Sequence, residues 1–455
     1  MTAGRPPIDV AAVLAADRAH VWHPYTPMDD WRREHAPLVV VSARGSSFEL
    51  ADGRRLLDGN GSWWVSTLGH NHPRLVDALK RQADAMCHVS LAGIAHAPSA
   101  LLARELAAVA PRDDADPLDQ VFYSDDGSTA IEAAVKMCVQ SFAQTGRPQK
   151  TRFVALEGAF HGETIGATSL GGVRVFRRPF AGVVFDCVHA PSPASDAPGC
   201  APAWAEAFDG IAQILEREHE TLAGVVLEPI VQGVAGMRVY PPAYLRAVRD
   251  LCTRHDVRLV VDEVFTGYGR LGSMWACDLA EIVPDLMCVA KGFTGGILPM
   301  AATLVRRSLL AAFDGGRERA FLYGHSFCGN PLGAAVAREV LAIYREDSIV
   351  AGVAARHDRI RSCFERLRDG PVTSRIVRDA RAIGAIGAAD LRDASSGYTA
   401  GVGWRVYAEA LRRGAYLRPL GDVVYVTPSL NVPLDELDRL LAVVEESVEA
   451  VAAHA

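Results

Sequence analysis

The sequence contains no C-x-x-C pair, no run of basic residues and no long apolar stretch at its N-terminus. Its nine cysteines are scattered and odd in number, so neither a zinc site nor a disulfide framework is indicated, and no metal is expected. Lys plus Arg number 47 and Asp plus Glu 54, a net charge of −7, so nothing points to nucleic acid or to an anionic membrane. Without a signal peptide or a membrane span, a cytoplasmic protein with free thiols is expected.

Apolar residues are abundant by contrast: 49% of the 455 residues are hydrophobic and 22% are charged. This length exceeds one ordinary core, so it predicts two domains or one large α/β domain with an appendage. The sequence shows neither an internal repeat nor a low-complexity tract.

Continuous apolar runs alternate with helical spacing through the middle of the chain. This alternation predicts a mostly parallel sheet, buried on both faces and flanked by helices. The expected strands are 120–124, 152–157, 222–229, 258–264 and 285–290, and the expected helices include 73–87, 128–142 and 243–255. Short strands are expected in 38–58, a surface loop at 191–204, and a smaller α/β domain from about residue 340 to a final helix at 434–453.

The stretch "CVAKGFTGGILPM" (288–300) holds one lysine, Lys291, and no other charge. A lysine there either extends to water from the strand end or stays desolvated and forms a Schiff base. Asp262, 29 residues earlier, ends the run "RLVVD" and is either a helix cap, a loop ion pair or a functional carboxylate. Because a carboxylate keeps a pyridine nitrogen protonated, Asp262 and Lys291 together are what pyridoxal phosphate requires.

Two further segments offer groups for such a cofactor. "DDGSTAIEAA" places Gly127 and Ser128 between a strand and a helix, where backbone N–H groups bind an oxyanion, although Ser is also a common N-cap. "GAFHGET" offers Phe160 and His161 as a stacking face, and an isolated pair of this kind is otherwise part of a core.

Together, "VVDEVFTGYGRLG", the lysine of "AKGFTGG" and "HSFCGNPL" resemble the class III aminotransferases, which are fold type I pyridoxal-phosphate enzymes. The resemblance covers nearly the whole chain. It implies an N-terminal segment, 1–64, that joins the small domain, a large cofactor-binding domain, 65–338, and a C-terminal small domain, 339–455. Within the class, the chain most resembles the branch that converts 8-amino-7-oxononanoate to 7,8-diaminononanoate in biotin biosynthesis, on the segments "VWHPYTPM", "GSWWVSTLGHNHP", "EPIVQGVAGM" and "YLRPLGDVVY".

The resemblance also implies a role for each matching residue. Lys291 would hold the cofactor and shuttle the proton, and Asp262 would pair with the pyridinium. The other implied cofactor-binding residues are Gly127, Ser128, Phe160 and His161, with His325 and Ser326 supplied across a homodimer with composite sites. The implied substrate-binding residues are Tyr25, Trp63, Trp64, Phe160, Gly324, Tyr425 and Arg418, of which Arg418 would clamp the carboxylate. Alternatively, Trp63 and Trp64 are plain core residues and Arg418 forms a surface ion pair.

Three positions depart from the branch. Phe160 stands where a tyrosine is usual, Asp126 replaces a serine, and His325 stands where the enzymes that use S-adenosylmethionine have proline. "YGHSF" is closer to lysine-using enzymes, whereas the aromatic rings near Tyr25 and Trp63 favour S-adenosylmethionine as the amino donor. The alternatives that stay open are the lysine-dependent form, another ω-aminotransferase, a pyridoxal-dependent racemase or aminomutase, and a non-catalytic binding protein.

Overall fold

The computed structural model describes residues 8–34, 37–194, 204–392 and 401–454. Most of the predicted surface loop at 191–204 lies outside these residues, and Trp204 begins helix α9. In the described part of the chain, no helix combines the length and the apolar character needed to cross a membrane.

A seven-stranded sheet forms the centre of the larger part of the molecule, in the order β4-β12-β11-β10-β7-β5-β6. The paired strands are parallel except for β12, which is antiparallel to both β11 and β4. The sheet is therefore mostly parallel, as the sequence predicts. Its strands are β4 (Gln120–Ser124), β5 (Arg152–Leu156), β6 (Cys187–Ala190), β7 (Leu222–Leu227), β10 (Arg258–Asp262), β11 (Leu286–Val289) and β12 (Ala301–Val305).

Helices cover both faces of this sheet. In β10, Leu259 and Val261 join one hydrophobic cluster, and Val260, between them, joins another on the opposite face. This alternation explains the continuous apolar run, because both side-chain directions are buried. One face packs against α6 (Gly127–Gln144) and α7 (Ile165–Leu170), and the other packs against α5 (Ala97–Val109), α9 (Trp204–Glu218), α10 (Pro242–Arg254) and α12 (Pro331–Glu346).

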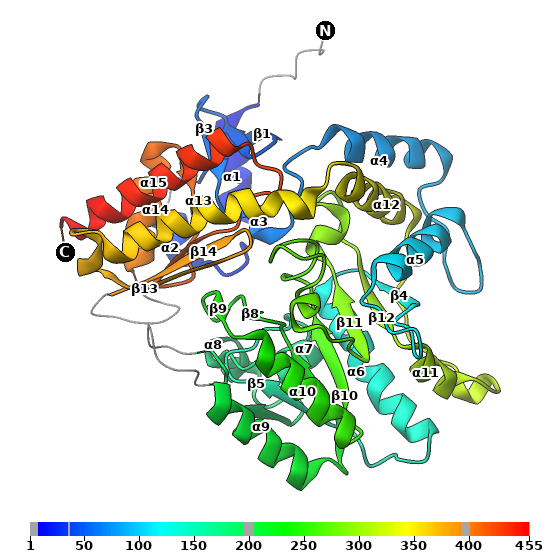
Figure 1. Ribbon diagram of the computed structural model, residues 1–455. Helices are drawn as coiled ribbons and strands as arrows, with labels where there is room; N and C mark the ends of the chain where they lie inside the picture. The colour runs from blue at the N-terminus through cyan, green and yellow to red at the C-terminus, as the bar shows by residue number, and fades with distance from the viewer. Residues whose placement is uncertain (1–7, 35–36, 195–203, 393–400, 455) are drawn as a thin grey trace.

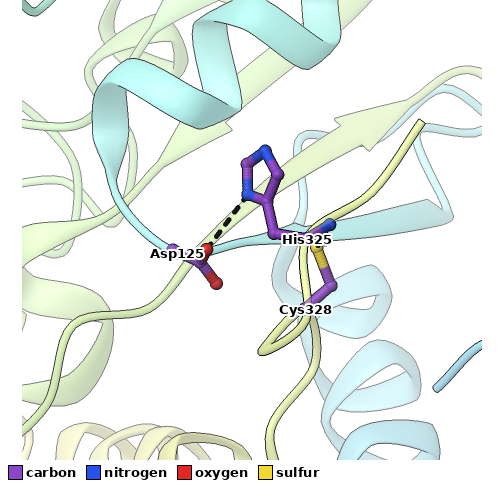
Figure 2. Close-up of side chains that lie close together, drawn as sticks. All are labelled: Asp125, His325 and Cys328. Carbon is purple, nitrogen blue, oxygen red and sulfur yellow. Dashed lines mark hydrogen bonds and ion pairs between the residues drawn. The ribbon is translucent and has the colours of Figure 1, made fainter. Parts of the chain in front are cut away.

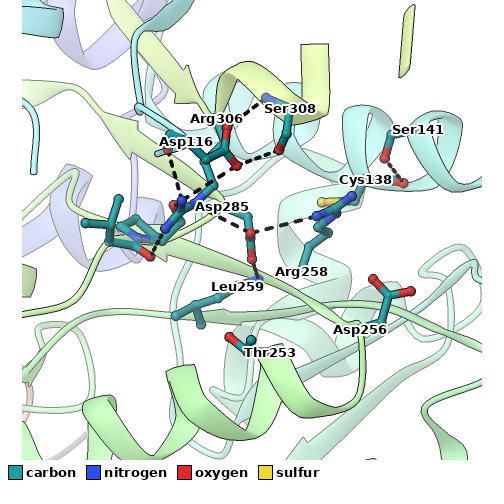
Figure 3. Close-up of polar contacts among 12 residues, drawn as sticks. Asp116, Cys138, Ser141, Thr253, Asp256, Arg258, Leu259, Asp285, Arg306 and Ser308 are labelled. Carbon is teal, nitrogen blue, oxygen red and sulfur yellow. Dashed lines mark hydrogen bonds and ion pairs between the residues drawn. The ribbon is translucent and has the colours of Figure 1, made fainter. Parts of the chain in front are cut away.

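A polar network pins the edge of the sheet where β10 and β11 begin (Figure 3). The Asp285 carboxylate accepts hydrogen bonds from the Leu259 backbone N–H and from Arg249, both at 2.7 Å. Arg306 lies 3.8 Å from the same carboxylate and donates to the Asp116 carbonyl at 3.0 Å. These contacts connect three segments at the amino-terminal ends of the strands. The candidate site lies at the opposite, carboxyl-terminal edge of the sheet.

The smaller part combines both ends of the chain (Figure 1). The strands β13 (Val377–Ile383), β14 (Ile386–Leu391) and β16 (Val423–Val426) form an antiparallel sheet, packed with α13 (Ile349–Asp369), α14 (Val402–Arg413) and α15 (Leu434–Ala452). A second sheet joins β1 (Val40–Arg44), β2 (Ser47–Leu50) and β3 (Arg55–Asp58) to β15 (Ala415–Tyr416).

In that second sheet, Leu57 of β3 pairs with Ala415 of β15, so the N-terminal strands lie against the C-terminal elements. The domain boundaries predicted at residues 64 and 338 stay predictions. Residue 338 lies within α12, so no change of element marks the second boundary.

A buried ion pair connects this smaller part to the cavity wall. Arg381 of β13 pairs with Asp390 of β14 at 2.8 Å and donates to the Met237 carbonyl at 2.9 Å. Met237 lies in the hairpin between β8 (Val231–Gln232) and β9 (Arg238–Val239). That hairpin carries Val234, which lines the cavity described below, so the ion pair holds a part of the cavity wall in place.

Candidate active site

A cavity of about 470 Å³ opens at the carboxyl-terminal edge of the central sheet. Asp262 is the last residue of β10, Glu228 follows β7, Lys291 comes two residues after β11, and Asp125 follows β4. The carboxyl ends of these strands meet at one edge, which is where open α/β sheets bind ligands. Seven of the predicted site residues line the cavity: Trp64, Gly127, Ser128, Phe160, His161, Asp262 and Lys291.

Lys291 is partly buried in the cavity wall, and its Nζ lies 4.7 Å from the centre of the Trp64 ring. Burial lowers the pKa of its amine to about 8, although the carboxylates of Asp262 and Glu228 act in the opposite direction. The backbone of Lys291 has φ of 48°, a left-handed conformation that is costly for a non-glycine residue. The amine is therefore held at the cavity with part of it neutral near neutral pH.

The Asp262 carboxylate is buried and held from two sides. Its Oδ2 lies 2.8 Å from His161 Nδ1, and its Oδ1 accepts a hydrogen bond from the Val264 backbone N–H at 3.1 Å. His161 is only 3% exposed, and its Nε2 has no hydrogen-bond partner in the described part of the chain. These contacts fix the carboxylate at the cavity, where a pyridinium would pair with it.

The N-terminus of α6 forms a close-fitting cradle for a phosphate. A Cβ added to Gly127 would lie 2.8 Å from Val264 Cγ1, and one added to Gly162, whose φ is +125°, would lie 2.2 Å from Ser128 Oγ. Two acidic neighbours have partners of their own: Asp126 caps α6 by accepting from the Thr129 N–H, and Asp125 pairs with His325. The first residues of this 18-residue helix, Gly127 and Ser128, line the cavity, so their backbone amides are available to an anion there. The Lys291 amine, the Asp262 carboxylate and this cradle fit pyridoxal phosphate.

Three predicted substrate-binding residues gather beside the cavity and do not line it. Tyr25 OH donates to the carboxylate of Glu163, a lining residue, at 2.5 Å. The Tyr25 ring meets Trp63 edge-on at 5.5 Å, and the Arg418 guanidinium lies 5.7 Å from the Trp63 ring. Arg418 also donates to the Tyr25 carbonyl at 3.3 Å.

Backbone strain is concentrated in this region. Tyr25, Trp63 and Trp64 have φ values of 52°, 57° and 73°, in the same left-handed range as Lys291. Such conformations persist only where the surrounding structure imposes them, and they cluster at functional sites. Trp63 is 41% exposed, so the interpretation as a plain core residue does not describe it.

The remaining predicted residues lie away from the cavity. Tyr425 is buried behind Trp64, whose indole Nε1–H donates to the Tyr425 hydroxyl at 3.3 Å. Gly324 and Ser326 are exposed on the surface, and among the described residues His325 is connected to the site through Asp125, 3.0 Å away.

Three carboxylates that line the cavity were not anticipated: Asp125, described above, Glu163 and Glu228. Glu228 is buried and accepts hydrogen bonds from the Gly233 and Phe160 amides at 2.8 and 3.1 Å. Burial, with Asp262 nearby, raises the pKa of Glu228 to about 7. The signal was present in the sequence, because Glu228 follows the buried run "LAGVVL" just as Asp262 closes its own strand. For Glu163, which meets Tyr25, the sequence gives no comparable signal.

Comparisons with known proteins agree with this geometry. The class III aminotransferase family model matches residues 29–448. The adenosylmethionine-8-amino-7-oxononanoate aminotransferase of Geobacter sulfurreducens is 38% identical, over 98% of this chain and 99% of its own.

Two solved structures are also similar. The enzyme of that same name from Methanocaldococcus jannaschii has a TM-score of 0.91 and 31% identity, covering 97% of this chain and 99% of its own. An omega transaminase from Pseudomonas jessenii in complex with PMP has a TM-score of 0.89 and 25% identity, covering 97% and 98%. With its fold, its cavity and a family match across nearly its whole length, the chain belongs to the class III aminotransferases, which use pyridoxal phosphate.

Proposed function

We propose that this aminotransferase converts 8-amino-7-oxononanoate to 7,8-diaminononanoate, with S-adenosylmethionine as the amino donor. The observation that carries the proposal is the position of Arg418, a cation beside an aromatic rim and next to the cavity that holds Lys291 and Asp262. The names of the Geobacter sulfurreducens and Methanocaldococcus jannaschii relatives support this substrate and this donor.

Lys291 is the group that moves the proton. Pyridoxal phosphate, when bound, supplies an electron sink for the bond that is broken at the substrate carbon. The Nζ of Lys291, with its pKa lowered to about 8, would take the proton from the donor carbon and pass it to the cofactor carbon. In the second half-reaction it would move a proton in the reverse direction, to the carbon of the keto substrate. Asp262 favours a protonated ring nitrogen, and His161 holds the Asp262 carboxylate in position.

The phosphate and the ring are held by the residues around Lys291. The amides at Gly127 and Ser128 bind the phosphate at the start of α6, where the helix dipole favours negative charge. Phe160 lines the cavity and presents a ring without a hydroxyl, so it contributes an apolar face only. Trp64 closes the wall beside Lys291 Nζ.

The rim of the cavity, formed by Tyr25, Trp63, Trp404 and Arg418, selects the substrates. The Arg418 guanidinium lies against Trp63 and, at 5.3 Å, Trp404, and no carboxylate of the described residues pairs with it. A guanidinium in this setting suits the carboxylate of the oxononanoate, which it can bind with two parallel hydrogen bonds. Tyr25 and Trp63, which are 39% and 41% exposed, offer ring surface to the adenine and the sulfonium of S-adenosylmethionine.

A second subunit completes the proposed site. Gly324, His325 and Ser326 lie in a segment whose neighbours Leu322 and Phe327 are 88% and 59% exposed. Large apolar side chains at this exposure suit burial against another copy of the chain. In such a homodimer, His325 and Ser326 reach the phosphate of the partner's cofactor. The eight cysteines in the described residues are free thiols, which supports a cytoplasmic location.

A second candidate is another ω-aminotransferase activity, on a diamine or an ω-amino acid. The similarity to the omega transaminase of Pseudomonas jessenii favours it. A lysine-dependent form of the first reaction differs only in its donor, and "YGHSF" is the feature that favours it.

Single-turnover amination separates these candidates. The purified holoenzyme is mixed with S-adenosylmethionine, lysine or a simple diamine, freed of the donor, and then given 8-amino-7-oxononanoate. We expect 7,8-diaminononanoate by mass spectrometry, fastest after S-adenosylmethionine. Amination of a simple keto acid or aldehyde without reaction of the oxononanoate would replace the proposal with the second candidate.

A further inference from the structure

Three potential metal ligands meet beside the cavity, and two of them, Asp125 and Cys328, have no role in the proposed function. Asp125, His325 and Cys328 each offer one ligand atom, and these atoms lie within 4.8 Å of one another (Figure 2). Asp125 stands at the end of β4, and the other two come from the segment before α12. Their oxygen, nitrogen and sulfur atoms are a donor set typical of Zn²⁺.

The spacing of two of these ligands is itself suited to a metal. His325 and Cys328 form an H-x-x-C pair, "HSFC", which has the spacing of a C-x-x-C pair with a histidine as its first ligand. A tight turn closes this pair, because the Cys328 N–H donates to the His325 carbonyl at 3.2 Å. The His325 N–H also lies 3.1 Å from Cys328 Sγ, as a donor to sulfur. Two ligands on a turn with two residues between them are a common local arrangement in zinc sites.

The surroundings of His325 orient its ring toward Asp125. Its Nε2 lies 3.0 Å from the Tyr323 hydroxyl, and its Nδ1 lies 3.0 Å from Asp125 Oδ2. Although it is this close, Nδ1 makes no hydrogen bond of good geometry in the described part of the chain, and it is buried. A partner on the outer nitrogen and a free lone pair on the inner one is the arrangement that metal-bound histidines adopt.

We propose that Asp125, His325 and Cys328 bind one Zn²⁺ ion, with water as the fourth ligand. On binding, the Cys328 thiol loses its proton to solvent as the zinc–sulfur bond forms, and His325 binds through Nδ1. The ion joins the segment 323–328 to the turn that precedes Gly127, so it fixes the wall of the cavity nearest the phosphate cradle. Because this site engages both ring nitrogens of His325 within one chain, it is an alternative to the proposed contact of that ring with the partner's phosphate, and it leaves that contact to Ser326. It is independent of which substrate the enzyme uses.

Zinc binding to the dialysed holoenzyme tests the proposal directly. We expect isothermal titration with Zn²⁺ to show one equivalent per chain. We also expect Co²⁺ in its place to give the near-ultraviolet sulfur-to-metal absorption band that a thiolate ligand produces. The variants Cys328→Ser and His325→Gln are expected to weaken binding by about tenfold or more and to remove that band. Cys87→Ser is the matched control, since Cys87 is an exposed cysteine outside the cluster.

Each outcome decides for or against the site. Stoichiometric binding that survives Cys87→Ser and is lost in Cys328→Ser supports it. Equal binding by the wild type and Cys328→Ser, or binding only at millimolar Zn²⁺, would overturn it. Far-ultraviolet circular dichroism of each variant distinguishes lost ligands from lost folding, and the absorbance of the bound cofactor shows whether the main site is intact. Since no turnover is measured, failure of the proposed function leaves this result unaffected.

Discussion

His161 Nδ1 lies 2.8 Å from Asp262 Oδ2, and both side chains are buried in the wall of the cavity. The proton between them belongs to Nδ1, because Nε2 is buried and has no acceptor among the described residues. His161 therefore acts through Asp262, whose charge is the feature that matters for a pyridine ring.

Asp262→Asn is expected to lower turnover by at least about a hundredfold, because the uncharged amide no longer favours a protonated ring nitrogen. The cofactor should remain bound, since the cradle at Gly127 and Ser128 is unchanged. Nitrogen NMR with labelled cofactor measures the protonation directly. His161→Gln is the comparison and should lose less, as it keeps the carboxylate. A protonated ring nitrogen with unchanged turnover in Asp262→Asn would contradict this role.

Lys291→Ala is expected to abolish transamination, by several orders of magnitude, while the fold is retained. Lys150 provides a matched control, because burial lowers its pKa to about 8 as well. Its Nζ donates to the carbonyls of His219, Leu222 and Asp256 at 2.6, 3.2 and 2.9 Å, far from the cavity chemistry.

Lys150→Met should therefore reduce the free energy of unfolding by about 1–3 kcal/mol, the cost of leaving carbonyls unpaired, and keep turnover. Stopped-flow assays and thermal unfolding of both variants test the pair. Near-normal turnover in Lys291→Ala would sink the assignment.

Lys291 and Lys150 differ in how far their environment can be predicted from the sequence. The apolar runs gave the parallel strands, since a strand buried on both faces has no polar side, and Asp262 and Lys291 interrupt such runs at the correct edge. Strand β12 and its reversed direction were not anticipated, because a short run such as "AATLV" does not specify its direction. Lys150, whose pKa burial lowers to the same value, gave no signal because its partners are backbone carbonyls, which every residue has.

Sequence motifs predicted the lining of the cavity better than they predicted the residues outside it. Glu228 could have been found by the same pattern as Asp262. Tyr425 was expected to bind substrate, and it lies behind Trp64, because motif context does not tell which ring of a packed pair faces the cavity. The role predicted for Gly324 and Ser326 requires a second subunit. Both are exposed in the single chain, so that role stays a prediction.

The pH dependence of cofactor uptake follows from the pKa of Lys291. Only the unprotonated amine can attack the cofactor aldehyde, so uptake by the cofactor-free protein should rise with pH through a midpoint near pH 8. Between pH 7 and pH 9 the unprotonated fraction increases about tenfold.

The Glu228→Gln variant tests the cause of that midpoint. The Glu228 carboxylate raises the pKa of Lys291, so its loss should move the midpoint to lower pH. Absorbance-monitored uptake across pH 6–10 measures both proteins. A midpoint near pH 10, that of an ordinary lysine, would refute the desolvated amine.

Arg418→Lys should impair the oxononanoate half-reaction more than the donor half-reaction. Lysine keeps the positive charge and loses the planar fork that binds a carboxylate by two hydrogen bonds. It also loses the stacking on Trp63 and Trp404. The two half-reactions are followed separately by stopped-flow absorbance, with Arg359→Lys, a surface ion-pair residue, as the control. Equal damage to both half-reactions, or damage to neither, would count against the clamp.

Trp63 provides the test of the amino donor. Its ring is exposed, is held at φ of 57°, and meets the Tyr25 ring edge-on, so it presents a face to the rim of the cavity. An aromatic face attracts a cation such as a sulfonium by about 0.5–2 kcal/mol, which corresponds to about 2- to 30-fold in rate. Trp63→Ala is therefore expected to slow the S-adenosylmethionine half-reaction by this factor, whereas Trp63→Phe, which keeps a ring, should slow it less.

Lysine as donor supplies the decisive comparison. It has no ring to stack on Trp63, and "GHSF" around His325 is the one feature that favours it. His325 contacts Asp125 beside the phosphate cradle, whereas Trp63 lies at the rim, where a donor would enter. We therefore expect S-adenosylmethionine to react with the bound cofactor far faster than lysine at equal concentration, as seen in stopped-flow spectra. A faster reaction with lysine, unaffected by Trp63→Ala, would reassign the donor and leave the aminotransferase activity in place.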